Sequence, residues 1–409
     1  MKNVNPVRGT YDYAPIQAEN REIIKEKILK SYQNNGFSLI TTPVLENLEL
    51  LDSSDGGDNL RLMFKTIKRG DKLDLTKENL TEKDICEEGL RYDLTVPLAR
   101  FYAGNREKLP TPFKAIQIDY AFRAERPQKG RDRQFLQCDI DIIGDNTSNA
   151  EIDIISTALN TYNDLGIDNV TMKINDRRIL NALILNFGFK EEEITSICVS
   201  LDKFDKIGIE GVKQELIEKE YSENNVNSLL GAINDVRENG IDNLVKYGVS
   251  GELIQNVTNI IDCVNSVVEN SKCEFDLSII RGQGYYTGTV YEAYADGFNG
   301  AIGGGGRYDK MIEKLIGVNV SAVGFSIGFV RVMIILEAKN IKKEKLKVAL
   351  IYDDQDDMKQ VLNFKQKLMN DYAVSIYVRP KNMKALLDKL KFANFDAFIT
   401  MKDENIKLI

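Results

Sequence analysis

The chain has 409 residues, of which 43% are hydrophobic and 28% charged, a length and mix typical of a globular protein of two or three domains. It contains no histidine, which excludes Ser-His triads, histidine-ligated zinc and histidine general bases. Its formal net charge of −8 argues against non-specific coating of nucleic acid, so a nucleic-acid partner must meet a local basic surface.

The sequence also bears on the compartment. No apolar run approaches the roughly 20 residues that cross a bilayer, and the opening MKNVNPVRGTYDY lacks the apolar stretch of a signal peptide. The five cysteines form no CxxC pair and are odd in number, which indicates reduced thiols. We therefore expect a cytoplasmic protein with no membrane partner.

The first part of the chain predicts helices and strands in irregular alternation. Apolar residues at helical spacing within 17–35 predict a helix that ends at Gly36. Residues 37–46 predict a strand that meets Pro43, and residues 60–75 a hairpin. The next expected elements are a helix near 95–104, strands at 113–122 and 135–143, and a helix at 149–165. This order favours an α+β fold with a mixed, largely antiparallel sheet flanked by helices over a regular parallel array.

The rest of the chain divides by composition. Several amphipathic stretches rich in Glu, Asn and Lys predict a mostly helical insertion, and strand-like, glycine-rich sequence follows it. A polar run then precedes a helix–strand alternation that predicts a small α/β domain. The expected parts are a domain made of 1–175 and 273–337, a helical insertion at 176–272, a linker at 338–344 and a small domain at 345–409.

The densest cluster of charge lies in FRAERPQKGRDRQFLQCDID, from Phe122 to Asp141. A loop between two predicted strands holds its basic side chains, which are Arg123, Arg126, Lys129, Arg131 and Arg133. Arginine forks suit phosphate oxygens, and a basic loop between rigid strands can hold a polyphosphate. From composition alone, a solvated hairpin tip with salt bridges accounts for the cluster equally well.

Three further segments combine glycine with polar side chains. Four consecutive glycines at 303–306 let the backbone approach a ligand closely. IRGQGYYTGTVY at 280–291 offers an arginine and paired tyrosines to a small polar, partly aromatic ligand. GFSIGFVR at 324–331 allows close helix–sheet packing and presents an arginine where a phosphate can sit. Each segment also fits an ordinary turn or core strand, and none alone decides a function.

In their order and combination these segments resemble histidyl-tRNA synthetase, a class II aminoacyl-tRNA synthetase family. TTPVLE at 41–46 resembles motif 1, the dimer-interface strand, FRAERPQKGRDRQF at 122–135 resembles motif 2, and GFSIGFVR resembles motif 3. RGQGYYTGTVYE at 281–292 resembles the histidine-specific segment, and GLRYDLTVPLAR at 89–100 resembles the substrate loop. The likeness extends from about residue 6 to about residue 336.

The resemblance implies a class II synthetase-like antiparallel sheet flanked by helices, a shortened anticodon-binding-like domain at 345–409, and a homodimer. The implied reaction is ATP-dependent activation of L-histidine to histidyl-adenylate, with Mg²⁺ accompanying ATP, followed by transfer to the 3′ end of histidine tRNA. The loop 128–134 would contact the acceptor stem. Because carboxylate and phosphates are all anionic, cationic positioning does most of the catalytic work, which suits a chain without histidine.

The resemblance also implies roles for individual residues in catalysis and ATP binding. Arg123 would contact the α-phosphate and the substrate carboxylate, Arg281 the α-phosphate and Arg331 the γ-phosphate. The other ATP contacts would be Glu125, Arg131 and Phe135, with the phenylalanine ring stacked on adenine.

The histidine pocket follows from the same resemblance. Asp93, Thr95 and Gln137 would hold the α-ammonium group, and Asp141 and Tyr286 would face the imidazole. The implied histidine-binding set is Asp93, Leu94, Thr95, Arg123, Gln137, Asp141, Arg281, Tyr285, Tyr286 and Tyr308. For Asp141 an alternative is a strand-end carboxylate that pairs with a nearby arginine.

The sequence departs from the family pattern in three places. Gln283 and Gly284 occupy the middle of the histidine-specific segment, and Val330 stands where motif 3 usually has glutamate. Only 65 residues run from Lys345 to Ile409, against roughly 90 in an ordinary anticodon-binding domain. Two alternatives therefore stay open: a histidine-sensing regulatory subunit of ATP phosphoribosyltransferase, and a paralogue that makes the adenylate for another acceptor.

Overall fold

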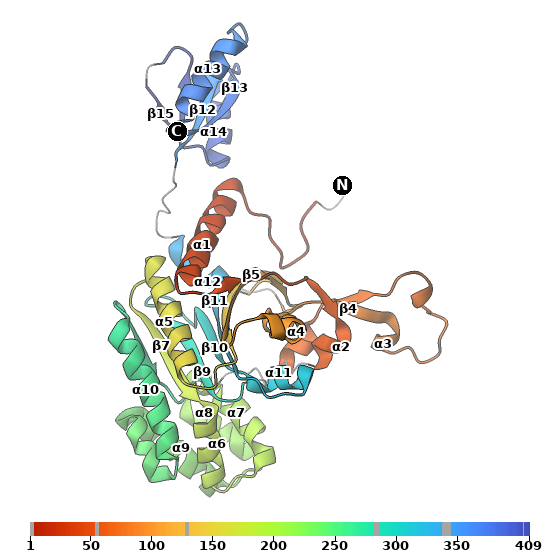
Figure 1. Ribbon diagram of the computed structural model, residues 1–409, viewed down its shortest axis with the longest axis vertical. Helices are drawn as coiled ribbons and strands as arrows, with labels where there is room; N and C mark the ends of the chain where they lie inside the picture. Colours follow the sequence, from red (N-terminus) through yellow and green to blue (C-terminus); the bar gives the residue numbers. More distant parts are fainter. Residues whose placement is uncertain (1–3, 54–56, 127–130, 281–285, 338–344, 404) are drawn as a thin grey trace. The chain divides into compact units, whose positions relative to one another are not determined.

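The computed structural model describes residues 4–53, 57–126, 131–280, 286–337, 345–403 and 405–409 (Figure 1). The expected linker at 338–344 lies outside these residues. The chain forms two compact units, one of residues 25–335 and the other of residues 1–24 together with 336–409.

An eight-stranded sheet is the centre of the larger unit. Its strand order is β1-β5-β6-β11-β10-β9-β7-β8. The strands are β1 (Ser38–Leu39), β5 (Phe113–Phe122), β6 (Gln134–Ile143), β11 (Ala322–Gly328), β10 (Gly303–Arg307), β9 (Thr289–Tyr294), β7 (Val170–Asp176) and β8 (Ser271–Phe275). Every neighbouring pair from β5 to β7 is antiparallel, and only β1 and β8 at the edges pair in parallel. The largely antiparallel sheet expected from the sequence is confirmed.

The two faces of β6 differ in chemistry. Side chains alternate between the faces of a strand, so Cys138, Ile140 and Ile142 share one face while Asp139 and Asp141 share the other. All five are buried. The apolar face packs on helices, whereas the acidic face needs polar partners or a ligand.

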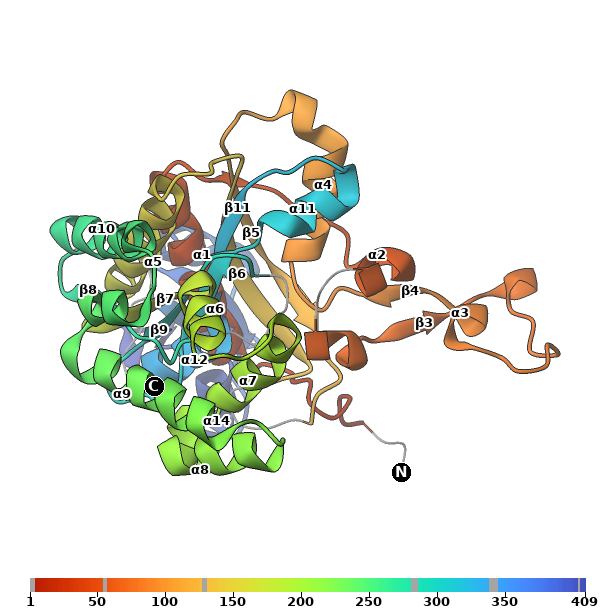
Figure 2. The same cartoon turned by 90° about the horizontal axis from the view of Figure 1, so that it is seen from below.

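Helices cover both faces of the sheet (Figures 1 and 2). On one side α5 packs on β6, β7 and β11, with α10 against it. On that same side the Tyr32 hydroxyl of α1 donates to the Cys138 carbonyl oxygen at 3.1 Å. On the other side α4 packs against α11. These helices are α1 (Pro15–Asn34), α4 (Thr95–Asn105), α5 (Asn149–Asp164), α10 (Gly251–Val267) and α11 (Asp309–Ile316), and α12 (Phe329–Leu336) follows β11 directly.

The connection from β7 to β8 is helical. It contains α6 (Arg177–Asn186), α7 (Ile194–Leu201), α8 (Phe204–Glu218), α9 (Glu223–Asn239) and the 3-10 segment Ile241–Tyr247 before α10. Because β7 and β8 are parallel neighbours, the chain must cross back along the sheet between them. The helices provide that crossing.

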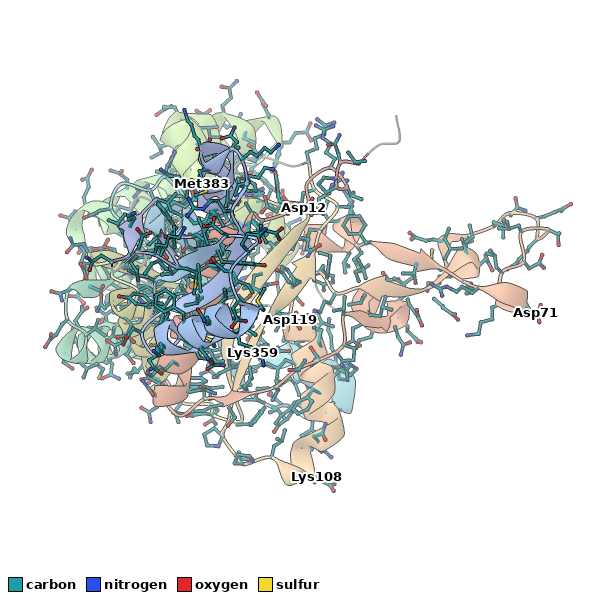
Figure 3. All side chains as sticks on the ribbon, turned by 90° about the horizontal axis from the view of Figure 1, so that it is seen from above. Asp12, Asp71, Lys108, Asp119, Lys359 and Met383 are labelled. Atoms are coloured by element: carbon teal, nitrogen blue, oxygen red, sulfur yellow. The ribbon has the colours of Figure 1, made fainter. Side chains whose placement is uncertain are left out.

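A three-stranded sheet forms an arm beside the main sheet. Its strands are β2 (Leu45–Asn47), β4 (Cys86–Leu90) and β3 (Lys65–Ile67), accompanied by α2 (Leu48–Ser53) and α3 (Glu82–Ile85). The hairpin predicted within 60–75 is wrong: β3 pairs with β4, and Gly70–Lys72 is a 3-10 turn. Asp71 lies at the far end of the arm (Figure 3). The strand predicted through Pro43 is divided into β1 and β2.

The residues after 345 form the sheet of the smaller unit. The strands β12 (Lys347–Tyr352), β13 (Ala373–Val378), β14 (Ala397–Thr400) and β15 (Lys407–Leu408) stand in the order β13-β12-β14-β15. The helices α13 (Met358–Leu368) and α14 (Met383–Phe392) connect the parallel strands. Apolar side chains are buried on both faces of β12, which confirms the small α/β fold.

In the part of the chain that the structure describes, no helix is both long and apolar enough to span a bilayer.

Candidate functional site

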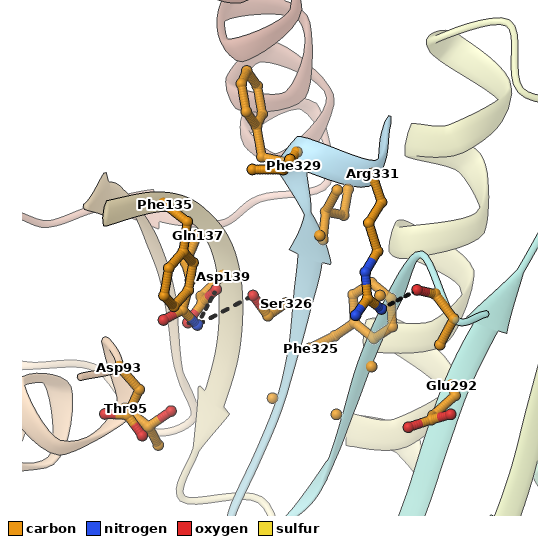
Figure 4. A pocket seen from close by; sticks show the side chains of 18 of the residues that line it. Asp93, Thr95, Phe135, Gln137, Asp139, Glu292, Phe325, Ser326, Phe329 and Arg331 are labelled. Atoms are coloured by element: carbon orange, nitrogen blue, oxygen red, sulfur yellow. Dashed lines mark hydrogen bonds between the residues drawn. The ribbon is translucent and has the colours of Figure 1, made fainter. Parts of the chain in front are cut away.

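A cavity of about 760 Å³ lies against β6, β10 and β11 on the acidic face of β6 (Figure 4). The predicted site residues that line it are Asp93, Thr95, Arg123, Glu125, Arg131, Phe135, Gln137, Asp141, Tyr286, Tyr308 and Arg331. Leu94 does not line it, since its side chain is fully buried in the core. Arg281 and Tyr285 lie outside the described residues. The structure thus brings together residues from segments up to 238 positions apart, from Asp93 to Arg331.

Glycines form part of the cavity wall because side chains do not fit there. A Cβ atom on Gly324 would lie 1.9 Å from Oδ1 of Asp141, and one on Gly305 would lie 1.9 Å from the carbonyl oxygen of Gly324. Both glycines belong to adjacent antiparallel strands, β11 and β10. The strands can therefore approach the ligand space with bare backbone.

One end of the cavity holds buried carboxyl groups. The Tyr308 hydroxyl donates to Oδ1 of Asp141 at 2.6 Å. Burial raises the pKa of Asp141 to about 7 although this hydrogen bond lowers it, and burial raises the pKa of Asp93 to about 6. Burial, with the nearby Asp141, also raises the pKa of Asp139 well above its ordinary value. A cation bound beside these groups would stabilise their charged forms.

Two acceptors near these carboxyl groups have no hydrogen-bond partner among the described residues. Oδ1 of Asp93 accepts the Val96 N–H at 3.2 Å in the first turn of α4, whereas Oδ2 has no hydrogen-bond partner among the described residues. Oε1 of Gln137 is also buried without one in the same part of the chain. Buried acceptors without partners are uncommon because they cost free energy of folding. We therefore expect a ligand to supply the hydrogen-bond donors for these two oxygens.

Arginines also line the cavity. The Arg123 guanidinium lies 5.0 Å from the centroid of the Phe135 ring, and its Nε donates to the Tyr92 carbonyl oxygen at 3.0 Å. Arg331, in the first turn of α12, donates to the Ala301 carbonyl oxygen. The Arg131 guanidinium is 3.7 Å from the Glu125 carboxylate. Packing and hydrogen bonds thus fix guanidinium groups toward space that an anion can occupy.

The lining residues that the sequence interpretation did not assign to the site include Asp139, Ser326 and Glu292. Asp139 could have been found, because two acids at i and i+2 in the otherwise apolar run CDIDII predict one shared polar face. Ser326 and Glu292 carry no such local signal, since their approach to the cavity depends on strand pairing.

The cavity therefore offers groups of both charges. Its carboxyl groups and orphan acceptors suit an ammonium group and a nitrogen heterocycle, while its arginines suit phosphates and a carboxylate. An amino acid with a basic ring, placed beside a nucleoside triphosphate, satisfies both sets of groups.

Sequence comparison identifies relatives of the chain. The chain matches the family model described as histidyl-tRNA synthetase over residues 9–332. It is 38% identical over 408 residues to a histidine–tRNA ligase of Leifsonia xyli, covering 97% of this chain and 94% of that one. It is 37% identical over 418 residues to a probable histidine–tRNA ligase of Tropheryma whipplei, with coverages of 98% and 96%.

Solved structures share the fold. The histidyl-tRNA synthetase of Nostoc sp. superposes with a TM-score of 0.78 at 24% identity, over 97% of this chain and 91% of that one. A Bacillus halodurans protein described as an ATP phosphoribosyltransferase regulatory subunit/histidyl-tRNA synthetase gives a TM-score of 0.77 at 21% identity, over 97% and 98%. These likenesses show the architecture, and the match of the family model over most of the chain shows the lineage: the chain belongs to the histidyl-tRNA synthetase family.

Proposed function

We propose that this protein activates L-histidine with ATP to histidyl-adenylate and transfers the histidyl group to the 3′ end of histidine tRNA. The observation on which the proposal rests is the pair of orphan acceptors, Oδ2 of Asp93 and Oε1 of Gln137, in a cavity that also holds arginines. Family membership supports it, because the relatives bear the name histidine–tRNA ligase.

The histidine subsite extends along β6. Asp93, Thr95 and Gln137 hold the α-ammonium group, and Asp141, with Tyr286 and Tyr308, faces the imidazole. Gln137 and Asp141 are four residues apart on one face, or ~13 Å between Cα atoms at ~3.3 Å per residue. After two hydrogen-bonding side chains are allowed for, that span suits a ligand of histidine's length.

The ATP subsite lies among the arginines. Arg123 binds the α-phosphate and the substrate carboxylate, Arg331 binds the γ-phosphate, and Arg281 is assigned to the α-phosphate by family resemblance. Glu125 and Arg131 contact ATP, and Phe135 stacks on adenine. Fixed cations at the attacked phosphate lower the barrier by stabilising charge that builds up in the transition state.

Mg²⁺ accompanies ATP in this proposal. Within the described residues there is no cluster of three or more metal-binding side chains, while Glu125 and Glu292 line the cavity as single carboxylates. This fits an ion that keeps most of its waters and is held by substrate phosphates with one or two carboxylates. Bound there, Mg²⁺ would neutralise phosphate charge.

The remaining assignments extend the same proposal. Residues 1–175 and 273–337 form the class II catalytic domain, 176–272 the helical insertion, 338–344 a linker and 345–409 the anticodon-binding-like domain. The loop 128–134, of which 128–130 lie outside the described residues, contacts the acceptor stem. We place the protein in the cytoplasm as a homodimer.

Histidine-dependent ATP–pyrophosphate exchange tests the proposal. Purified protein with Mg²⁺ should exchange with L-histidine and with none of the other amino acids. Absent exchange, with histidine still bound in calorimetry, would overturn the ligase assignment and favour a histidine-sensing regulatory subunit. Exchange without charging of histidine tRNA would instead indicate another acceptor for the adenylate.

A further inference from the structure

We propose that Asp139 is a positioning residue that holds the amide of Gln137 so that its oxygen, rather than its nitrogen, faces the substrate's ammonium group. The inference rests on the proposed function, which assigns Gln137 to the α-ammonium of histidine. It adds a residue that does not itself touch the substrate.

The hydrogen bonds of Gln137 support this orientation. Its Nε2 lies 3.2 Å from Oδ2 and 3.5 Å from Oδ1 of Asp139, and 3.4 Å from Oγ of Ser326 (Figure 4). Both acceptors are on the same side of the amide group, since Ser326 stands directly opposite Asp139 in the pairing of β11 with β6. With its nitrogen directed to these acceptors, the amide oxygen is the atom left for a ligand, and it is the buried acceptor without a partner.

An amide turned by 180° would reverse the chemistry. Its N–H groups would face the ammonium, which has donors only, and its oxygen would face the acceptors of Asp139. The ammonium group of the substrate would then lose a hydrogen-bond acceptor and face N–H donors instead. Because an amide's two ends are nearly equal in shape, packing alone does not choose between the orientations. A neighbouring hydrogen-bond acceptor is needed to fix one orientation of the amide.

Asp139 has the properties of such an acceptor. It is buried, and on β5 its partner in register is Gln117, whose Nε2 donates to the Leu94 carbonyl oxygen at 2.8 Å. The amide nitrogen of Gln117 therefore does not compete with that of Gln137 for the oxygens of Asp139. Burial and the nearby Asp141 raise the pKa of Asp139 well above its ordinary value. In this proposal Asp139 acts as a hydrogen-bond acceptor, a role that the side-chain oxygen of asparagine can also fill.

The test compares two ligands that differ only in the ammonium group, L-histidine and 3-(imidazol-4-yl)propionate. Calorimetry gives the ratio of their dissociation constants for wild type, Asp139→Asn and Asp139→Leu. We expect Asp139→Asn to keep the preference for histidine within about threefold. Asp139→Leu, which has similar branching but no acceptor, should reduce it by about tenfold or more while binding imidazolylpropionate as wild type does. Asp139→Ala, which adds no volume, is measured alongside in case the leucine variant does not fold.

A double-mutant cycle with Gln137→Leu isolates the route of the effect. If Asp139 acts through Gln137, replacing Asp139 changes the preference little once Gln137 is leucine. Additive losses would overturn the inference, as would equal weakening of both ligands in Asp139→Leu, or an asparagine variant as impaired as the leucine one. Wild type without any preference for histidine would instead contradict the proposed ammonium site, and the inference would fall with it.

Discussion

Asp141 is buried beside the Tyr308 hydroxyl, and its pKa is about 7 in the folded protein against ~3.9 in an unfolded chain. The folded state therefore binds this proton more tightly than the unfolded state does. The resulting contribution to stability is complete below about pH 4 and is lost as the pH rises through about 7.

We expect the ligand-free protein to lose stability relative to Asp141→Asn between about pH 5 and pH 8, by ~1 kcal/mol or more, since each pKa unit corresponds to ~1.4 kcal/mol. Urea denaturation of both proteins at the two pH values measures this difference. If their stabilities change in parallel with pH, Asp141 does not have a raised pKa.

Gly324 offers a second test at the level of one atom. A methyl group there would lie 1.9 Å from Oδ1 of Asp141 and would displace the carboxylate from its position. Gly324→Ala should raise the KM for histidine at least tenfold, with a smaller change in the KM for ATP. Overpacking should also cost ~1–3 kcal/mol of stability.

Gly104→Ala is the matched control, because a Cβ atom at this position in α4 meets no other atom within 4 Å. It should leave both KM values unchanged. Equal effects of the two substitutions would show that the contact with Asp141 does not matter.

Residue types at the site were predictable from the sequence, but their hydrogen bonds were not. Asp93, Gln137 and Asp141 follow from the motifs, and all three line the cavity. Besides Asp139, the Gln137 amide nitrogen contacts Ser326, which is 189 residues away along the chain. Such a contact exists only after β6 and β11 have paired.

Among the secondary-structure elements, α5 and β10 are joined by a buried ion pair. Two of the three guanidinium nitrogens of Arg307, Nε and Nη2, donate to the Glu151 carboxylate at 2.7 Å and 2.6 Å. The Thr289 hydroxyl donates to the same carboxylate at 2.8 Å. Arg307 directly precedes Tyr308, which reaches Asp141. The pair thus holds one wall of the cavity in place.

Replacing Glu151 should remove the nearer carboxylate from the buried Arg307 guanidinium and leave it the more distant Asp309, whose Oδ1 lies 3.4 Å from Nη1. We expect Glu151→Gln to lower the free energy of unfolding by ~3–5 kcal/mol. Glu274→Gln breaks an exposed pair with Lys272 and should cost less than ~1 kcal/mol. Urea denaturation compares the two, and a similar small loss in both would mean that the pair does not stabilise the fold.

Elements were predictable where their signals are local. The strands predicted at 113–122 and 135–143 form β5 and β6. Each is apolar on at least one face, and the sequence between them contains the turn-forming residues Pro127 and Gly130. The 60–75 hairpin failed because β3 pairs with β4 beyond α3. The pair Gly70-Asp71 indicates a turn within this segment, but such a local signal cannot reveal a strand partner about 20 residues away.

At the scale of the whole molecule, exposed apolar side chains gather where motif 1 was recognised. Leu39, Val44 and Leu45 are 48%, 37% and 47% exposed, around Pro43. Large apolar residues at one exposed place favour association with another protein surface. They support the homodimer of the proposal.

We expect sedimentation equilibrium to show a dimer, and Leu45→Glu to shift it toward monomer by at least tenfold in dissociation constant. Val245→Glu, at a position 61% exposed in the helical segment, is the control and should remain a dimer. A monomeric wild type, or equal dissociation of both variants, would contradict the homodimer.

The absence of histidine from the chain has one practical consequence for spectroscopy of the site beside Asp141. The chain has no histidine of its own, so in a complex every imidazole signal would come from the ligand. Ring-labelled histidine would separate these signals from those of the 17 tyrosine and 17 phenylalanine rings of the chain. Their chemical shifts, followed across pH, would report the charge of the ring held beside Asp141.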